Sequence, residues 1–325
     1  MAGPFFTFLA QSLWWTAGIA DQQMGFHAPG PWTIARQMRH RALDRPFHLG
    51  LLTAGFKFTN IIQLHAFWLN ERLKSFRASI DPDPATVDIF WVYSQDPLPP
   101  DRLSLIEDSI RRARPGTPVV NPPEVFDAYH RPGIFRQLAE AGVPVPRSSF
   151  RPEDIGTLVV FKPDGKQSEV IGPVPWDGPR PGMRAFEFIE TRGKDGLYCR
   201  YRAIYLLGRS YAGTFQASDR PIVRAHNRPG GDSWRLTAAE SGDLQRVAAV
   251  TGLDFFTADL LRPSDGSRSV LTDINSFPML KERDLRPGFY GHQHDFSIVR
   301  PADSDGMSAW DWLEIALTER VTKRA

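Results

Sequence analysis

Two apolar segments flank an Asp-Gly turn in the sequence FFTADLLRPSDGSRSVLTDIN, residues 255–275. This pattern predicts a β-hairpin, because Asp265-Gly266 readily adopts the positive φ angles of a tight hairpin turn. Asp259 lies seven residues before Gly266, and Asp273 lies seven residues after it (266 − 259 = 273 − 266). A turn centred on this glycine would therefore place the two carboxylates opposite each other on neighbouring strands.

Facing carboxylates destabilise a sheet unless another group compensates their charge. A divalent cation is the simplest compensation, and Asn275 would add a neutral oxygen on the same face as Asp273, since residues i and i+2 of a strand share a face. Carboxylate and amide oxygens are ligands that Mg²⁺ prefers. Alternatively, one aspartate faces solvent or Asp273 caps a turn. The hairpin alone leaves both interpretations open.

The overall composition is that of an ordinary globular protein. The chain has 325 residues, 42% hydrophobic and 23% charged, which suggests two or three domain-sized units. A net charge of +2 gives no reason to expect binding to nucleic acid or to an anionic membrane. The single cysteine, Cys199, excludes an internal disulfide and a multi-cysteine metal site, and it favours the reducing cytoplasm. Residues 5–20 are apolar, but no positive segment precedes them, so we expect a core or docking segment rather than a secretion signal.

Prolines and glycines divide the chain into segments. Residues 1–120 combine helical and strand-like patterns, and Pro122-Pro123 marks a boundary after them. Gly142 and Gly252 are expected to end two of the later helices. The expected helices span 35–43, 60–76, 101–113 (with Asp101 as N-cap), 131–142, 240–251 and part of 303–325. The expected strands span 86–93, 118–121, 158–161, 185–190 and the pair within 198–215.

Seven segments in a fixed order, within roughly residues 119–282, resemble the ATP-grasp superfamily. The resemblance is greatest to the branch that includes the RimK-like glutamate ligases, glutathione synthetase and D-alanine ligase. The segments are AGVPVP (141–146), Lys162-Pro163, FEFI (186–189), YRAIYLLG (201–208), RAHNRPGG (224–231), ADLL (258–261) and DINSFP (273–278). The resemblance implies an α+β ATP-grasp fold. It would comprise an N-terminal α/β domain (1–120), a central subdomain with a lid (121–188) and a C-terminal subdomain with a magnesium site (189–325), enclosing a nucleotide cleft.

The same resemblance implies a role for each residue that matches a motif. ATP phosphates would be bound by Lys162, by Lys166 in the lid loop 164–169, and by Arg131 where the family usually has a lysine. The adenine pocket would be lined by Glu187, Phe188 and Ile189. The reacting carboxylate or transferred phosphate would be held by Arg202 and Arg224, with Asn227 nearby. One or two Mg²⁺ ions would be held by Asp259, Asp273 and Asn275.

The function implied is an ATP- and Mg²⁺-dependent ligase that joins a carboxylate to an amine through an acyl phosphate and releases ADP and phosphate. The acid would be a small molecule or a peptide, no nucleic acid or membrane would take part, and a homo-oligomer is left open. Two alternatives remain: a kinase on the same scaffold, and a nucleotide- or partner-binding module without catalysis. His292 and His294 form a His-x-His pair that we interpret as polar loop rather than a metal site.

Overall fold

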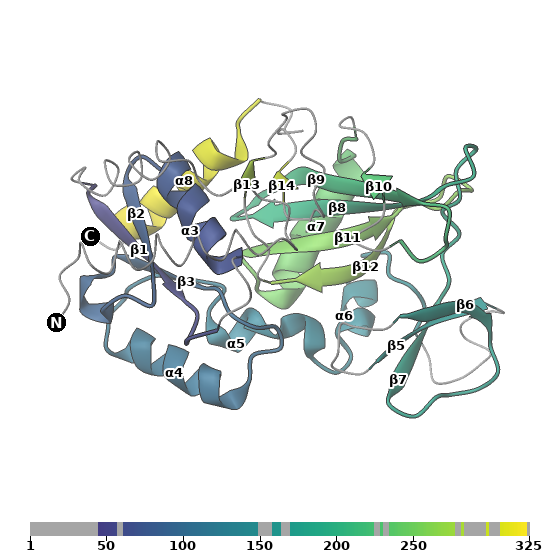
Figure 1. Cartoon of the computed structure of the whole chain (residues 1–325), viewed down its shortest axis with the longest axis horizontal. Helices are drawn as coiled ribbons and strands as arrows, with labels where there is room; N and C mark the ends of the chain where they lie inside the picture. The colour runs from purple at the N-terminus through teal and green to yellow at the C-terminus, as the bar shows by residue number, and fades with distance from the viewer. Residues whose placement is uncertain are drawn as a thin grey trace. The chain divides into compact units, whose positions relative to one another are not determined.

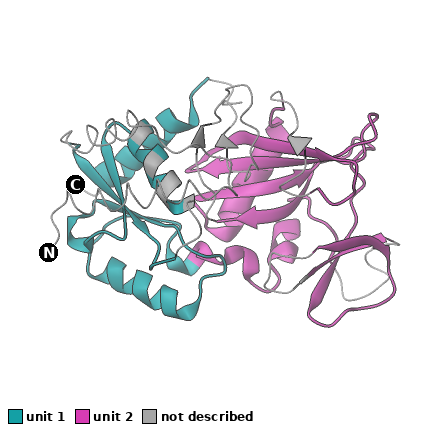
Figure 2. Ribbon diagram, in the orientation of Figure 1, with its two compact units in different colours: residues 1–124, 277–325 teal, residues 125–276 magenta. Residues whose placement is uncertain are grey.

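The computed structural model describes residues 45–56, 61–148, 158–163, 170–223, 228–229, 234–276, 281–282, 297–298 and 306–323. The chain divides into two compact units, one formed from residues 1–124 and 277–325 and the other from residues 125–276 (Figure 2). The divisions predicted from the sequence, at residues 120 and 188, stay a prediction. The expected helix 35–43 and the apolar segment 5–20 lie outside the described residues.

The first unit contains a parallel four-stranded sheet in the order β2-β1-β3-β4 (Figure 1). All residues of β3 are buried, as expected for a continuous apolar run in a parallel sheet. The elements are β1 (Phe47–Leu52), α3 (Ile61–Arg72), β2 (Phe76–Ile80), η1 (Pro84–Thr86), β3 (Ile89–Val92), α4 (Pro100–Arg111), β4 (Val119–Val120), α5 (Pro123–Phe126, which continues into the second unit), β13 (Lys281–Glu282), β14 (Ser297–Ile298) and α8 (Ala309–Thr322).

The second unit contains two antiparallel sheets, with strand orders β6-β5-β7 and β10-β9-β8-β11-β12. The helix α7 packs against β8 and β9 and contacts α6 (Figure 1). The elements are η2 (Ala128–His130), α6 (Ile134–Glu140), β5 (Leu158–Pro163), β6 (Ile171–Pro175), β7 (Met183–Glu187), β8 (Tyr198–Leu206), β9 (Arg209–Ser218), β10 (Arg228–Pro229), α7 (Ala238–Thr251), β11 (Phe255–Leu261) and β12 (Val270–Asn275).

The larger sheet buries one face against α6 and α7. Ala258 and Leu260 of β11, with Leu271 and Ile274 of β12, belong to the hydrophobic core on that face. The helix α7 begins at a capping box, in which the Thr237 hydroxyl accepts from the Glu240 N–H and the Glu240 carboxylate accepts from the Thr237 N–H. On the opposite face of β11, Thr257 and Asp259 follow the buried Phe255, so this face combines apolar and polar side chains.

Several expected boundaries were wrong. The helix expected over 60–76 ends at Arg72, and Phe76 already begins β2. The helix expected over 131–142 begins only at Ile134 and ends at Glu140. Asp101 lies inside the first turn of α4, which begins at Pro100 with Pro99 as N-cap. Proline suits the first helical position, since its fixed φ is helical and its missing N–H would have no intrahelical partner there. The expected strand 86–93 is shorter, because a 3₁₀ turn occupies Pro84–Thr86. The strand expected over 185–190 ends at Glu187.

Two β-bulges interrupt the larger sheet on either side of its centre. In β12, Asp273 pairs with Asp259 while Leu271 pairs with Leu260, so Thr272 is the extra residue. In β9, the register shift leaves Gly213 and its neighbour opposite Arg202 of β8. The strands at the centre of the sheet, β8 and β11, pair regularly between these two bulges.

We predict that Gly213→Ala lowers the free energy of unfolding by about 1–3 kcal/mol, because its Cβ would lie 2.5 Å from the Arg202 carbonyl oxygen and force the backbone apart. Chemical denaturation of the variant measures this loss. The matched control is Gly242→Ala within α7, where the nearest atom lies 3.8 Å away and alanine favours the helix. Equal stability of the two variants would contradict the prediction.

Candidate functional site

Three charged residues form a row across the larger sheet. Arg202 of β8 is the register partner of Asp259 of β11, and Asp259 is in turn the register partner of Asp273 of β12. The pairing of the two carboxylates predicted from the Asp-Gly turn is therefore confirmed. The bulge at Thr272 allows Leu271 to reach the core while Asp273 lies on the opposite face.

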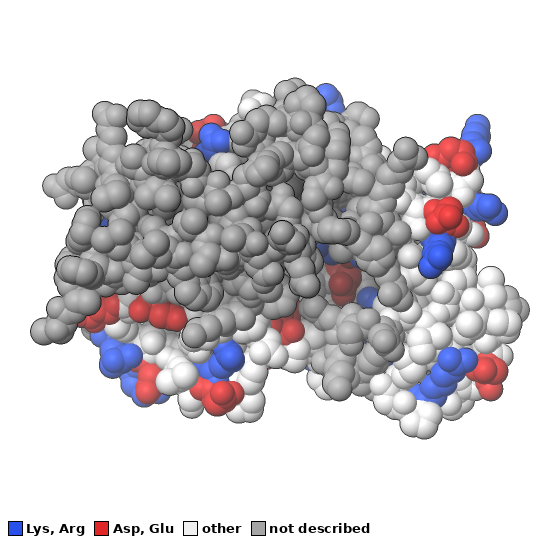
Figure 3. All heavy atoms as spheres, viewed as in Figure 1, with Lys and Arg blue, Asp and Glu red and all other residues white. Residues whose placement is uncertain are grey.

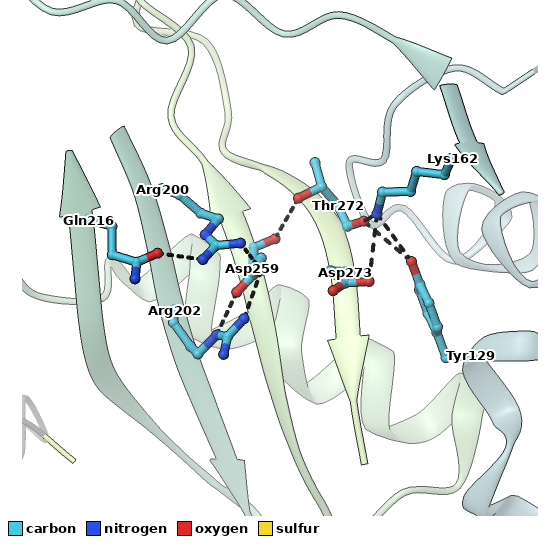
Figure 4. Close-up of polar contacts among 8 residues, drawn as sticks. All are labelled: Tyr129, Lys162, Arg200, Arg202, Gln216, Asp259, Thr272 and Asp273. Atoms are coloured by element: carbon cyan, nitrogen blue, oxygen red, sulfur yellow. Dashed lines mark hydrogen bonds and ion pairs between the residues drawn. The ribbon is translucent and has the colours of Figure 1, made fainter. Parts of the chain in front are cut away.

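Two arginines hold the central carboxylate of this row (Figure 4). Asp259 is only 3% exposed. The Arg202 Nε donates to Oδ1 at 2.7 Å and its Nη2 donates to Oδ2 at 3.0 Å, a fork that matches the carboxylate geometry. Arg200 Nη1 lies 3.2 Å from the same Oδ2. Two guanidinium groups thus already offset the charge that we expected a divalent cation to offset.

The two guanidinium groups also determine the ionisation of Asp259. Burial by itself raises the pKa of this carboxyl group, since it disfavours the charged form. The charges of Arg200 and Arg202 and the hydrogen bonds from Arg202 outweigh burial and lower the pKa to about 2. Asp259 is therefore a fixed negative charge at neutral pH.

Lys162 approaches the other end of the row from β5. Its Nζ donates to the Thr272 carbonyl oxygen at 2.8 Å and to the Tyr129 hydroxyl at 3.4 Å, and it lies 3.6 Å from Oδ1 of Asp273 (Figure 4). The ammonium also lies 5.7 Å from the centre of the Phe186 ring. Lys162 of the smaller sheet therefore contacts both the Asp273 carboxylate and the backbone of the bulge at Thr272.

Several of these contacts involve residues that the sequence analysis had not selected. Arg200 lies two positions before Arg202, so strand alternation places both on one face and could have indicated it. The roles of Thr272 and Tyr129 depend on the bulge and on a chain segment distant in sequence, and no motif signals either. Gln216, whose side-chain oxygen accepts from Arg200, was likewise unmarked.

Of the residues predicted to line an adenine pocket, Glu187 is the last residue of β7, and Phe188 and Ile189 follow it. The Glu187 carboxylate accepts from Arg147 Nε at 3.0 Å and from Nη2 at 2.7 Å, and these hydrogen bonds lower the pKa of Glu187 despite its partial burial. The Glu187 N–H donates to the Arg147 carbonyl, and the Phe188 N–H donates to the Leu158 carbonyl. Phe188 and Ile189 are half-buried.

The remaining predicted site residues are placed as follows. Asn275 is the register partner of Thr257, one pair beyond Ile274 along β12. Arg131 follows η2, and its N–H donates to the Ala128 carbonyl. Residues outside the described part of the chain are Lys166, Arg224, Asn227, His292 and His294.

The oxygen atoms of the row fit a hard cation. Within the described residues no group of three or more His, Cys, Asp or Glu could hold a metal ion. The available set is smaller: two carboxylates and the amide of Asn275. The Asp273 side chain is 37% exposed and has a lysine at 3.6 Å, so its oxygens can accept a further ligand. Asp259 is more fully engaged by the arginines, which makes Asp273 the better placed carboxylate for Mg²⁺.

The described surface carries charges of both signs. Acidic and basic side chains lie interspersed over the described part of the face in Figure 3. This pattern agrees with the small net charge of +2. None of the helices in the described ranges combines the length and apolarity that crossing a membrane requires.

We predict that the free energy of unfolding falls as the pH is lowered from about 4 to about 2, by roughly 2 kcal/mol from Asp259. The pKa of Asp259 is depressed in the folded state, so its contribution is present above the unfolded pKa and is lost as protonation approaches the folded pKa of about 2. Glu240 also has a lowered pKa, so the measurement is the difference between the wild type and Asp259→Asn in acid denaturation. Parallel curves for the two proteins would contradict this assignment.

Comparison with known proteins finds similar solved structures. No family model and no curated protein matches the chain. The solved ATP-grasp ligase PsnB, complexed with a minimal precursor, matches at 17% identity over 86% of this chain and 99% of its own, with a TM-score of 0.53. D-alanyl-alanine synthetase A from Vibrio cholerae matches at 12% identity over 86% and 100%, with a TM-score of 0.53. An ATP-grasp ligase of Chryseobacterium gregarium, complexed with ADP and a leader and core peptide, matches at 10% identity over 86% and 97%, with a TM-score of 0.51.

At these low sequence identities, the matches show similarity of fold only. Membership of the RimK-like branch stays a prediction. The matches extend over nearly the whole length of each relative. The fold class predicted from the sequence is confirmed: this chain has the α+β ATP-grasp fold.

Proposed function

We propose that this protein is an ATP- and Mg²⁺-dependent ligase that joins a carboxylate to an amine through an acyl phosphate. The observation that carries the proposal is the row of Arg202, Asp259 and Asp273 across three strands, with Lys162 reaching its end from a second sheet. Two neighbouring carboxylates lie there between cations, in a fold shared with ATP-grasp ligases. Such an arrangement suits a metal nucleotide, whose phosphates need cations and whose metal needs carboxylates.

This proposal assigns a role in binding or catalysis to each charged residue of the row and to Lys162 and Asn275. Lys162 binds ATP phosphates, and Arg202 offsets negative charge that develops on the transferred phosphoryl group. Asp273, Asn275 and Asp259 hold Mg²⁺, which supplies charge neutralisation on the phosphate oxygens when bound. The remaining assignments follow the family resemblance: Arg131 and Lys166 at the phosphates, Glu187, Phe188 and Ile189 at adenine, Arg224 and Asn227 at the acid.

The reaction proceeds in two balanced steps. A carboxylate oxygen of the acid attacks the γ-phosphorus, and the bond from that phosphorus to the bridging oxygen breaks, with its electron pair leaving on ADP. The amine nitrogen then attacks the acyl carbon, phosphate leaves with the C–O electron pair, and the nitrogen gives up a proton. Holding both substrates beside the nucleotide supplies proximity and excludes water.

A peptide is our preferred acid substrate. PsnB and the ligase of Chryseobacterium gregarium are both complexed with peptides in their solved structures. A peptide offers Asp and Glu side-chain carboxylates as well as its terminus, and Lys side chains as amines. We place the enzyme in the cytoplasm, where ATP is available.

The test is analysis of the nucleotide products with ATP and Mg²⁺, pooled amino acids, small carboxylates and peptides that contain Asp, Glu and Lys. We expect ADP and free phosphate in equal amounts, dependent on both an acid and an amine. ADP with a phosphorylated product and no free phosphate would identify a kinase instead. Binding of ATP without turnover on any member of the pool would favour a nucleotide-binding module.

We predict that Asp273→Ala lowers turnover at least about a hundredfold, because it removes the better placed carboxylate of the cation site. The loss of stability should stay below about 1 kcal/mol, since the contact of Asp273 with Lys162 is long and partly exposed. Steady-state kinetics and thermal unfolding measure the two effects separately.

The control for this variant is Asp265→Ala, which removes an exposed carboxylate from the turn of the same hairpin. It should leave turnover unchanged. A fully active Asp273→Ala enzyme would remove Asp273 from the proposed metal site.

A further inference from the structure

A buried hydroxyl group lies on the polar face of the larger sheet, beside the row of charged residues. Thr257 of β11 is the register partner of Ile204 on β8 and of Asn275 on β12. Register partners lie on one face of a sheet, and so do residues two positions apart along a strand. Thr257 therefore shares a face with Asp259 and Asn275, two of the residues assigned to the proposed Mg²⁺ site.

This hydroxyl has no hydrogen-bond partner among the residues that the structure describes. Thr257 is 2% exposed, and its Oγ1 is buried without a partner there. Most buried side-chain polar atoms of proteins are hydrogen-bonded, and an exception indicates a water or an ion that belongs to the site. A valine would have the same shape without a hydroxyl to desolvate. A threonine at this position therefore indicates a group that the protein binds.

The neighbours of Thr257 show from which side such a group would reach it. Ile204 on β8 and Phe255, two residues earlier on β11, are apolar and 2% and 0% exposed. Asp259, two residues later, and Asn275 on β12 are the polar neighbours on the same face. Asn275 is only half-buried, so the side toward β12 is partly accessible. A polar ligand of Thr257 would thus lie toward Asp259 and Asn275.

The chemistry of these two neighbours favours a hydrated cation as that ligand. Carboxylate and amide oxygens suit Mg²⁺, which usually keeps several of its waters. A metal-to-water distance of about 2.1 Å and a hydrogen bond of about 2.8 Å together let such a water connect the cation to a hydroxyl about 5 Å away. The Cβ atoms of register partners are about 5 Å apart, so Thr257 is close enough to Asn275 for this reach.

We propose that Thr257 is a further binding residue of the Mg²⁺ site, and that its hydroxyl forms a hydrogen bond with a water that the cation retains beside Asp259 and Asn275. This inference rests on the proposed function, from which it takes the cation and its ligands. It adds a residue to which the family resemblance gives no role. It also accounts for a buried hydroxyl that the described part of the fold leaves without a partner.

The experiment separates the contribution of the cation from the rest of nucleotide binding. Calorimetry gives the dissociation constant of ADP with excess Mg²⁺ and again in EDTA, for the wild type, Thr257→Val and Thr257→Ser. We expect Thr257→Val to reduce the factor by which Mg²⁺ strengthens ADP binding about three- to tenfold, the effect of one hydrogen bond. Binding of ADP in EDTA should change less than about twofold. Thr257→Ser retains a hydroxyl and should keep most of the Mg²⁺ factor.

Thermal unfolding without ligand checks that the valine variant reports on the hydroxyl itself. Thr257→Val keeps the shape of the side chain and removes a buried polar group, so the midpoint of unfolding should not fall. A midpoint lowered by more than about 3 °C would indicate that the hydroxyl has a partner within the protein, and it would overturn the inference.

The matched control is Ser210→Ala on β9. The Ser210 Oγ is likewise buried without a hydrogen-bond partner in the described part of the chain. Ser210 pairs with Tyr205, which pairs with Phe256 of the hydrophobic core, so it lies on the opposite face of the sheet from Thr257. Loss of this hydroxyl should leave the Mg²⁺ factor unchanged, and an equal reduction in both variants would contradict a specific role for Thr257.

The outcomes distinguish the inference from the proposed function. If Mg²⁺ strengthens ADP binding to the wild type and Thr257→Val retains the whole factor, the inference is wrong while the proposed function stands. If the wild type binds no ADP, or binds it equally well with and without Mg²⁺, both fall.

Discussion

The fork between Arg202 and Asp259 is the interaction on which the polar face of the larger sheet depends. Asp259 is buried and directly faces Asp273, and without a cation this pair would repel within the sheet. Arg202 is the register partner of Asp259 on the other side, so the sheet itself brings the compensating charge. Removing one partner of a buried pair leaves an uncompensated charge and destabilises by about 3–5 kcal/mol.

The core side of the same strands holds this fork in place. Beyond the end of β11, Arg262 donates to both oxygens of Glu240, which is buried on α7, and Ser269 before β12 donates to the same carboxylate. Arg262 also lies over the rings of Tyr201 and Trp234. The hairpin is thus fixed to the helix on one face while it presents its acidic residues on the other, as a site on rigid elements requires.

Local sequence signals predicted the backbone pairing well and the side-chain contacts less well. The symmetry of Asp259 and Asp273 about Gly266 predicted their pairing correctly. The register next to the loop would place Asp259 opposite Thr272, and the bulge, which no sequence signal marked, shifts it by one residue to Asp273. Lys162 and Arg202 were selected by resemblance, and the structure brings them to the same row. Arg200, Gln216 and Tyr129 were missed, since their importance depends on hydrogen bonds between strands and loops distant in sequence.

The bulge at Thr272 has a consequence for how the site tolerates substitution. Lys162 bonds to the carbonyl oxygen of this residue, and every amino acid has that oxygen. Position 272 can therefore change its side chain without losing the acceptor, provided that the extra residue stays in the strand. Deleting this residue would instead restore a regular ladder and remove the carbonyl oxygen that Lys162 contacts. The identity of position 272 is thus under weaker constraint than the length of β12.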